Sequence, residues 1–87
     1  MRNIVFSPPA FEQYRYWQEN DLAILRKLNQ LLQECQRDPF KGTGKPEALK
    51  GNLAGRWSRR ITQEHRLVYR VYEHNVFVGS CRFHYEK

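Results

Sequence analysis

Apolar residues recur at two different periods along the chain, and the change of period divides it into two halves. A short strand is expected over residues 3–6. An aromatic stripe at spacings of three then predicts a helix with one buried face. Ser7 and Pro8 mark its start, because serine caps free amides and proline fits the first helical position. The stripe consists of Phe11, Tyr14 and Trp17.

A second helix is predicted from apolar residues at spacings of three and four. Asn20-Asp21 supplies its cap, and it should end near Arg37. The reason for this end is that Asp38 precedes Pro39, and the residue before a proline avoids the helical region. Its apolar positions are Ile24, Leu25, Leu28, Leu31, Leu32 and Cys35. The first half is therefore a strand and a helical hairpin, and we expect it to act mostly as a scaffold.

The second half begins with an irregular stretch, residues 39–55, which holds four of the five glycines and two prolines. Apolar residues then alternate in segments 57–61, 66–72 and 76–83, which predicts three strands, the last two joined as a hairpin. We expect a single α+β domain over residues 1–87. Its short N-terminal strand and two helices pack on a small, mainly antiparallel sheet, in the order β-α-α-β-β-β.

Alternation also predicts which side chains face the helices, because neighbouring residues of a strand point to opposite faces. The core side should carry Trp57, Arg59, Ile61, Leu67, Tyr69, Val71, Phe77, Cys81 and Phe83. In one register the open face then gathers Arg60, Arg66, Arg82 and His84. A bulge of one residue would change this set.

Charge is distributed unevenly between the halves. Residues 1–40 carry five basic and five acidic side chains, whereas residues 41–87 carry ten and four, which accounts for the whole net charge of +6. A one-sided excess of this kind indicates a polyanionic partner, either nucleic acid or an acidic protein. The alternative is a solvated surface that serves solubility.

Other classes of protein are disfavoured by the same sequence. No apolar run approaches the roughly 20 residues that span a bilayer, and the first residues lack the apolar stretch of a secretory signal, so we expect a cytoplasmic protein away from membranes. Cys35 and Cys81 are expected to be buried and unpaired. The spacing of His65, His74 and His84 does not suggest a metal site. We expect His65 to be a structural partner and His74 a surface turn residue.

The stretch 42–50, GTGKPEALK, looks at first like a phosphate-binding loop. Measured from Gly44-Lys45, the positions that require glycine and serine or threonine hold Pro39 and Pro46 instead. A nucleotide cofactor is therefore not expected, and the stretch should turn the chain back over the sheet. Pro46 would then stiffen the backbone just before Glu47.

An open basic face with one histidine and a flanking glutamate suits the cleavage of RNA without a metal. A general base takes the proton of the ribose 2′-hydroxyl, whose oxygen attacks the adjacent phosphorus, and a general acid protonates the departing 5′-oxygen. Glutamate suits the base, histidine the acid, and arginine the stabilisation of the extra negative charge. From the pattern alone, a solvated basic face is an equal alternative.

The run PFKGTGKPEALKGNLAGRWSRRITQEHRLVYRV, followed by CRFHY, resembles the YoeB branch of the RelE superfamily of bacterial toxins. The resemblance covers nearly the whole chain, and the linked blocks GKPE, LxGxWSRRI, EHRLVY and CRxHY make it specific. It implies a toxin of a type II toxin–antitoxin pair with a fold like that of microbial ribonucleases. Such toxins cleave messenger RNA in the ribosomal A site without a metal or another cofactor.

The resemblance also implies roles for single residues. Glu47 of GKPE is then the general base, Arg66 of EHRLVY the transition-state clamp and His84 the general acid, with Tyr85 completing the catalytic set. The substrate-binding residues expected around them are Lys45, Lys50, Arg60 and Arg82. Chains of this family tend to stop at the HY pair, whereas Glu86-Lys87 follow here, and we expect His84 to act despite them.

Partners follow from the resemblance as well. It implies an acidic, YefM-like antitoxin that wraps the toxin and displaces the geometry around His84 and Tyr85. Homodimerisation is implied too, as is contact with operator DNA only through the antitoxin complex. The alternatives are a non-catalytic RNA- or ribosome-binding module, a protein that only pairs with its antitoxin to repress transcription, and a gyrase inhibitor of the ParE type. That last type lacks this Glu, Arg, His and Tyr set.

Overall fold

Both predicted helices form where their capping residues place them in the computed structural model, which describes residues 1–85. Strand β1 spans Asn3–Phe6, and helix α1 follows over Pro8–Asn20. The Ser7 side chain accepts a hydrogen bond from the Ala10 amide at 3.2 Å. Asp21 caps helix α2, Leu22–Arg37, by accepting from the Ile24 amide at 3.1 Å. The predicted helical hairpin is confirmed.

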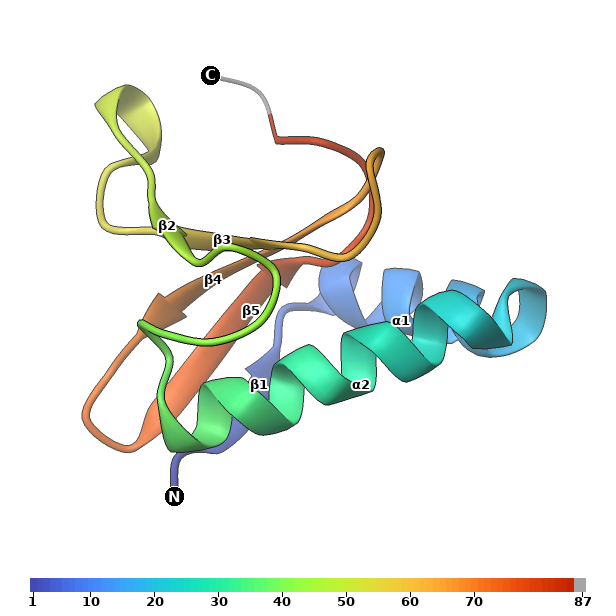
Figure 1. The fold of residues 1–87 in the computed structure, drawn as a ribbon, viewed down its shortest axis with the longest axis horizontal. Coiled ribbons are helices and arrows are strands. Elements are labelled where there is room, and N and C mark those ends of the chain that lie inside the picture. The colour runs from blue at the N-terminus through green and yellow to red at the C-terminus, as the bar shows by residue number, and fades with distance from the viewer. Residues whose placement is uncertain (86–87) are drawn as a thin grey trace.

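A mixed sheet of five strands forms the second layer, and both helices cover the same face of it (Figure 1). The remaining strands are β2 (Glu47–Ala48), β3 (Trp57–Arg60), β4 (Arg66–Val71) and β5 (Asn75–Ser80), and a 3-10 turn spans Gly51–Leu53. The strand order is β1-β5-β4-β3-β2, with β1 parallel to β5 and the other neighbours antiparallel. The predicted α+β class and the mainly antiparallel sheet are confirmed.

Strand β2 corrects the prediction that residues 39–55 are wholly irregular. Glu47 pairs with Ser58, and Ala48 pairs with Trp57. A pair of residues this short carries no alternating apolar pattern, so the sequence offers no signal for it. The consequence is that Glu47 belongs to the edge of the sheet instead of a loop beside it.

The core-facing side chains of β3 and β4 are those that alternation predicts. Leu67 and Tyr69 are buried against the helices, together with Ile61, which follows β3. Arg59 is also buried on this side. Ser58 and Arg60 point the other way and line a pocket on the open face. Arg59 and Arg60 therefore point to opposite faces of the sheet, and only Arg60 reaches the pocket.

The prediction for β5 is partly wrong. Val76, Val78 and Cys81 are the buried residues, whereas Phe77 and Phe83 are 36% and 56% exposed. The cause is a register shift: Tyr69 pairs with Val78 but Val68 pairs with Ser80, which leaves Gly79 as an extra residue. Such a bulge interrupts the alternation, so Phe77 before it and Cys81 after it lie on opposite faces instead of the same one. The strand also ends at Ser80, before the expected residue 83.

The structure also settles several smaller predictions. Both cysteines are buried and free, as expected. His74 is exposed in the turn between β4 and β5, and its carbonyl accepts from the Asn3 amide at 2.9 Å. Within residues 1–85, the helices lack the length and apolar character needed to cross a membrane.

Candidate active site

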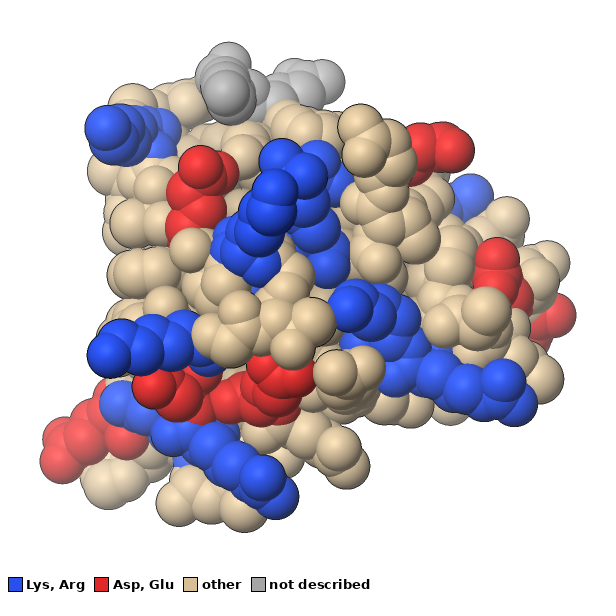
Figure 2. All heavy atoms as spheres, in the orientation of Figure 1, with Lys and Arg blue, Asp and Glu red and all other residues tan. Residues whose placement is uncertain are grey.

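A pocket of about 270 Å³ lies on the open side of the sheet, where β2, β3, the start of β4 and the C-terminal segment meet. Its lining residues are Lys45, Glu47, Ser58, Arg60, Arg66, His84 and Tyr85. Three of these side chains are cationic and one is a carboxylate, so the pocket favours an anionic ligand. Figure 2 shows Lys and Arg side chains gathered on the face over β2 and β3, with carboxylates beside them.

Glu47 reaches this pocket because the chain before it is fixed to β3. The Arg60 amide donates to the Gly44 carbonyl at 2.7 Å, and Glu47 then pairs with Ser58. Gly44 has a φ of +85°, and a Cβ there would lie 2.9 Å from the Arg60 carbonyl oxygen. Glycine is therefore required at this position for two reasons. The Glu47 side chain is exposed, so it can accept a proton from a bound ligand.

Arg66 is held by its own strand and by the turn before it. Its Nη1 donates to the carbonyl oxygens of Thr62, Gln63 and His65 at 2.8, 3.1 and 3.2 Å. The residue is only 7% exposed. An arginine fixed in this way presents its charge and its planar set of N–H donors in one place. It can therefore stabilise a negative charge that develops in the pocket.

His84 and Tyr85 are delivered by a reversal of the chain after β5. Phe83 adopts a φ of +67°, a conformation rare for a bulky residue. Its carbonyl accepts from the Arg66 amide at 3.0 Å, and its amide donates to His65 Nδ1 at 2.8 Å. The prediction that His65 is structural is thereby confirmed. A phenylalanine is not a residue that indicates a turn of this kind, so only the structure shows how His84 is oriented.

The two residues at the end of the described chain also contact each other and β2. The rings of His84 and Tyr85 have centroids 4.8 Å apart. The Tyr85 hydroxyl donates to Glu47 Oε1 at 3.2 Å. Glu86 and Lys87, which the sequence suggested would leave His84 undisturbed, lie outside the described residues.

Two predicted substrate-binding residues are not in this pocket. Lys50 lines an adjoining pocket of about 450 Å³, which shares Glu47 and Tyr85 with the first. Arg82 lies with its guanidinium 3.5 Å from the centroid of the Tyr16 ring, next to α1. The prediction that Arg82 shares the open face with Arg66 is therefore wrong, because the bulge at Gly79 and the end of β5 turn it toward the helix. Ser58, which the sequence did not single out, lines the pocket instead.

The arrangement suits proton transfer at a phosphodiester. A carboxylate and an imidazole line the same pocket with fixed cations, which are the groups needed to deprotonate an attacking hydroxyl, protonate a leaving oxygen and stabilise the charge between them. Among residues 1–85, His, Cys, Asp and Glu do not form any group of three or more that could hold a metal ion.

Comparison with known proteins shows which protein family this chain matches. A sequence model described as the YoeB-like toxin of bacterial type II toxin–antitoxin systems matches residues 6–85. The toxin YoeB of Escherichia coli (strain K12) is 50% identical over 82 residues, which cover 94% of this chain and 98% of the relative.

Two solved structures from Staphylococcus aureus are similar over nearly their whole length. A heterotetrameric complex of the YoeB–YefM toxin–antitoxin contains a chain with a TM-score of 0.89 and 50% identity, and the match covers 98% of this chain and 99% of that one. A YoeB dimer has a TM-score of 0.90 and 50% identity, with 97% and 98% covered.

Proposed function

This chain belongs to the family of YoeB-like toxins of bacterial type II toxin–antitoxin systems, and on that premise we propose that it is a metal-independent endoribonuclease that cuts messenger RNA in the ribosomal A site. The observation that carries the proposal is that Glu47, Arg66 and His84, from three separate parts of the chain, line one cationic pocket. The activity would stop translation, and its setting would be the cytoplasm, where ribosomes work.

The reaction divides between Glu47 and His84. The Glu47 carboxylate takes the proton of the ribose 2′-hydroxyl. The electron pair left on the 2′-oxygen then forms a bond to the adjacent phosphorus. The bond from phosphorus to the 5′-oxygen breaks, and the protonated His84 imidazole gives its proton to that oxygen. The products are a 2′,3′-cyclic phosphate and a 5′-hydroxyl. Each proton-transfer partner contributes typically about 10²–10⁴-fold.

Arg66 stabilises the extra negative charge on phosphorus in the transition state. The three carbonyl contacts of its Nη1 hold the guanidinium before substrate arrives. A preorganised donor of this kind is more effective than one that must reorient during the reaction. Lys45 and Arg60 in the same pocket, and Lys50 in the adjoining one, contact the neighbouring phosphates. Tyr85 orients Glu47 and stacks on a base.

We further propose that an acidic, YefM-like antitoxin binds this chain and that the free toxin dimerises. The support is that similar proteins have been solved as a YoeB–YefM complex and as a YoeB dimer. The net charge of +6 favours an acidic partner. The antitoxin would displace residues 84 and 85 from the pocket and would carry any contact with operator DNA. A complex that cleaves RNA as fast as the free toxin would contradict this mode of inhibition.

The test compares cleavage of ribosome-bound message by wild type, Glu47→Gln and His84→Ala. We expect each substitution to reduce the rate by about 10²-fold or more, because each removes a proton-transfer group. Glu73→Gln and His74→Ala are matched controls, since both residues are exposed in the turn before β5 and outside the pocket. Equal cleavage by all variants would overturn the residue assignment.

Other outcomes would favour other functions. Binding to ribosomes without any cleavage by wild type would identify a non-catalytic binding module. Repression of transcription with the antitoxin, without ribosome binding, would identify a co-repressor. Inhibition of gyrase would identify the ParE type.

A further inference from the structure

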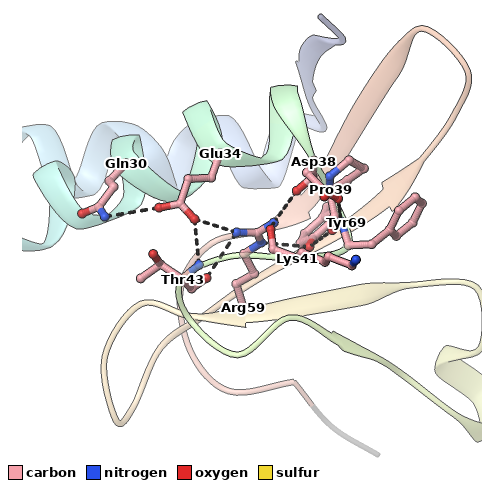
Figure 3. A network of polar contacts seen from close by, with 9 residues as sticks. Gln30, Glu34, Asp38, Pro39, Lys41, Thr43, Arg59 and Tyr69 are labelled. Carbon is pink, nitrogen blue, oxygen red and sulfur yellow. Dashed lines mark hydrogen bonds and ion pairs between the residues drawn. The ribbon is translucent and has the colours of Figure 1, made fainter.

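Behind the wall of the pocket lies a buried arginine that the proposed reaction does not use. Arg59 has no exposed surface, although its neighbours Ser58 and Arg60 in β3 both line the pocket. Its side chain points to the opposite face of the sheet, toward α2 and the segment that follows it (Figure 3). A buried guanidinium must be matched by acceptors, so its partners show what it holds.

The Arg59 guanidinium has five N–H donors, and the structure gives it five hydrogen bonds. Nε donates to the Tyr69 hydroxyl at 3.1 Å. Nη1 donates to Glu34 Oε1 and the Thr43 carbonyl, both at 3.2 Å, and Nη2 donates to the carbonyls of Asp38 and Lys41 at 2.7 and 2.9 Å. A guanidinium whose five N–H groups are all hydrogen-bonded is fixed in one orientation. Three of its acceptors are backbone carbonyls within residues 38–43.

The same segment is held by the partners of Arg59. The Tyr69 hydroxyl donates to the Pro39 carbonyl at 2.6 Å, and Glu34 Oε1 accepts from the Thr43 amide at 2.7 Å. Gly42 runs so close that a Cβ there would overlap Glu34 and come 2.9 Å from Arg59 Nη1. The segment between α2 and β2 therefore wraps around the guanidinium instead of looping into solvent (Figure 3).

The segment continues directly into the pocket. After Thr43 come Gly44, whose carbonyl accepts from the Arg60 amide, then Lys45, and then Glu47 paired with Ser58. Arg60 and Arg66, by contrast, project from β3 and β4, where the two residues pair with each other. Arg59 therefore anchors the part of the chain that carries the carboxylate, whereas the two arginines are held mainly by the pairing of β3 with β4 and by the turn between these strands.

We propose that Arg59 is a positioning residue: by ordering residues 38–43 it fixes Glu47 and Lys45 relative to Arg60 and Arg66. The proposal rests on the proposed function, in which Glu47 takes the proton from the 2′-hydroxyl. Loosening residues 38–43 should therefore slow the chemical step and leave substrate binding by Arg60 and Arg66 largely intact. A misplacement of about 1 Å can cost roughly 10²-fold in rate.

A purely structural role for Arg59 makes a different prediction. In that case, replacing Arg59 would lower the stability of the whole fold, and any loss of activity would follow the fraction of unfolded protein. Arg59→Lys separates the two roles, because it keeps the charge and removes the fork that reaches five acceptors. Val76→Ala is the matched control, since Val76 is fully buried near the start of β5, pairs with Ile4 and Val71, and has no polar side-chain group that could join the hydrogen-bond network.

The first measurement is kcat and KM of both variants on ribosome-bound message, at a temperature where circular dichroism shows both to be folded. We expect Arg59→Lys to lower kcat by about 10–100-fold with KM within about threefold of wild type. Val76→Ala should leave both constants near wild type. A folded Arg59→Lys protein with the kcat of wild type would overturn the proposal, as would an equal loss in Val76→Ala.

The second measurement is amide hydrogen exchange, which requires no activity. Arg59→Lys should speed exchange at the Thr43 and Arg60 amides, whereas exchange at the amides of β4 and β5 should stay as in wild type. Uniformly faster exchange would overturn the positioning role. If wild type proves not to cleave RNA, the proposed function fails and exchange alone decides whether Arg59 orders the segment. If Arg59→Lys does not fold, Tyr69→Phe replaces it, because it removes only the hydroxyl between Arg59 Nε and the Pro39 carbonyl.

Discussion

The hydroxyl of Tyr85 donates a hydrogen bond to Glu47 Oε1 at 3.2 Å and so joins two parts of the chain that are 38 positions apart. One is the edge strand β2, and the other is the segment that leaves β5 and carries His84. The bond holds the carboxylate toward the pocket in the absence of substrate. It also means that the proposed base and the proposed acid are positioned against each other by one side chain.

Replacing Tyr85 by phenylalanine tests this relationship. The variant keeps the ring and loses the hydroxyl, so we expect kcat to fall about tenfold, the scale of one hydrogen bond to a charged group. Tyr85→Ala should lose more, because the stacking surface is lost as well. The control is Tyr14→Phe, which removes a hydroxyl bonded to Asn29 Oδ1 at 2.7 Å, and neither residue lines the pocket. Wild-type kcat in Tyr85→Phe would show that the hydroxyl has no part in orienting Glu47.

Arg66 should not be replaceable by lysine. A lysine keeps the charge but cannot bond to the turn carbonyls and still present a planar fork to a phosphate. We expect Arg66→Lys to lower kcat/KM by about 10²-fold or more, the usual scale for a lost oxyanion donor. Arg70→Lys, on the same strand and outside the pocket, should be close to wild type. Single-turnover cleavage of ribosome-bound message measures both variants, and equal losses in the two would contradict the assignment.

Two glycines allow a test of how tightly residues 39–46 pack on β3. At Gly44 the φ is +85° and a Cβ would lie 2.9 Å from the Arg60 carbonyl, whereas at Gly51 the φ is +66° with open space around it. Gly51→Ala should cost about 1–2 kcal/mol for the left-handed backbone alone. Gly44→Ala adds a clash with backbone and should lower the free energy of unfolding by clearly more. Urea denaturation of both variants decides this, and equal costs would show that the segment shifts freely.

The network around Arg59 makes a prediction about acid stability. The Thr43 amide and other hydrogen bonds, with the Arg59 charge beside them, hold the pKa of Glu34 below its usual value of 4.5, although burial opposes the shift. A lowered folded-state pKa gives stability that is fully present above the unfolded-state pKa and lost as the pH falls through the folded-state pKa.

Glu34→Gln is the variant that checks the direction of this effect. Wild type should be more stable than Glu34→Gln at pH 7, and the difference should shrink as the pH falls below about 4.5 and the carboxyl protonates. Urea denaturation at pH 7, 5, 4 and 3 measures it. Glu19→Gln, at an exposed position on α1, should show no such convergence. A difference that grows toward low pH would have the wrong sign for this account.

Local sequence determined the helices, their ends and the face of the sheet on which two arginines lie. Ser7, Asp21 and the residue pair Asp38-Pro39 act within one turn of the chain, so their effect can be read from neighbours alone. Alternation in β3 and β4 likewise placed Arg60 and Arg66 on the open face, because period two is a property of each strand by itself.

Tertiary structure decided what depends on pairing between distant segments. The bulge at Gly79 arises from the register between β4 and β5, and it sends Arg82 to α1 instead of the pocket. The two-residue strand β2 exists only because β3 lies beside it. Arg59 looks like any other basic residue in the sequence, and only five acceptors gathered from α2, β4 and residues 38–43 make its burial favourable. Register, bulges and buried charge networks are set by contacts far apart in sequence, and no local pattern encodes them.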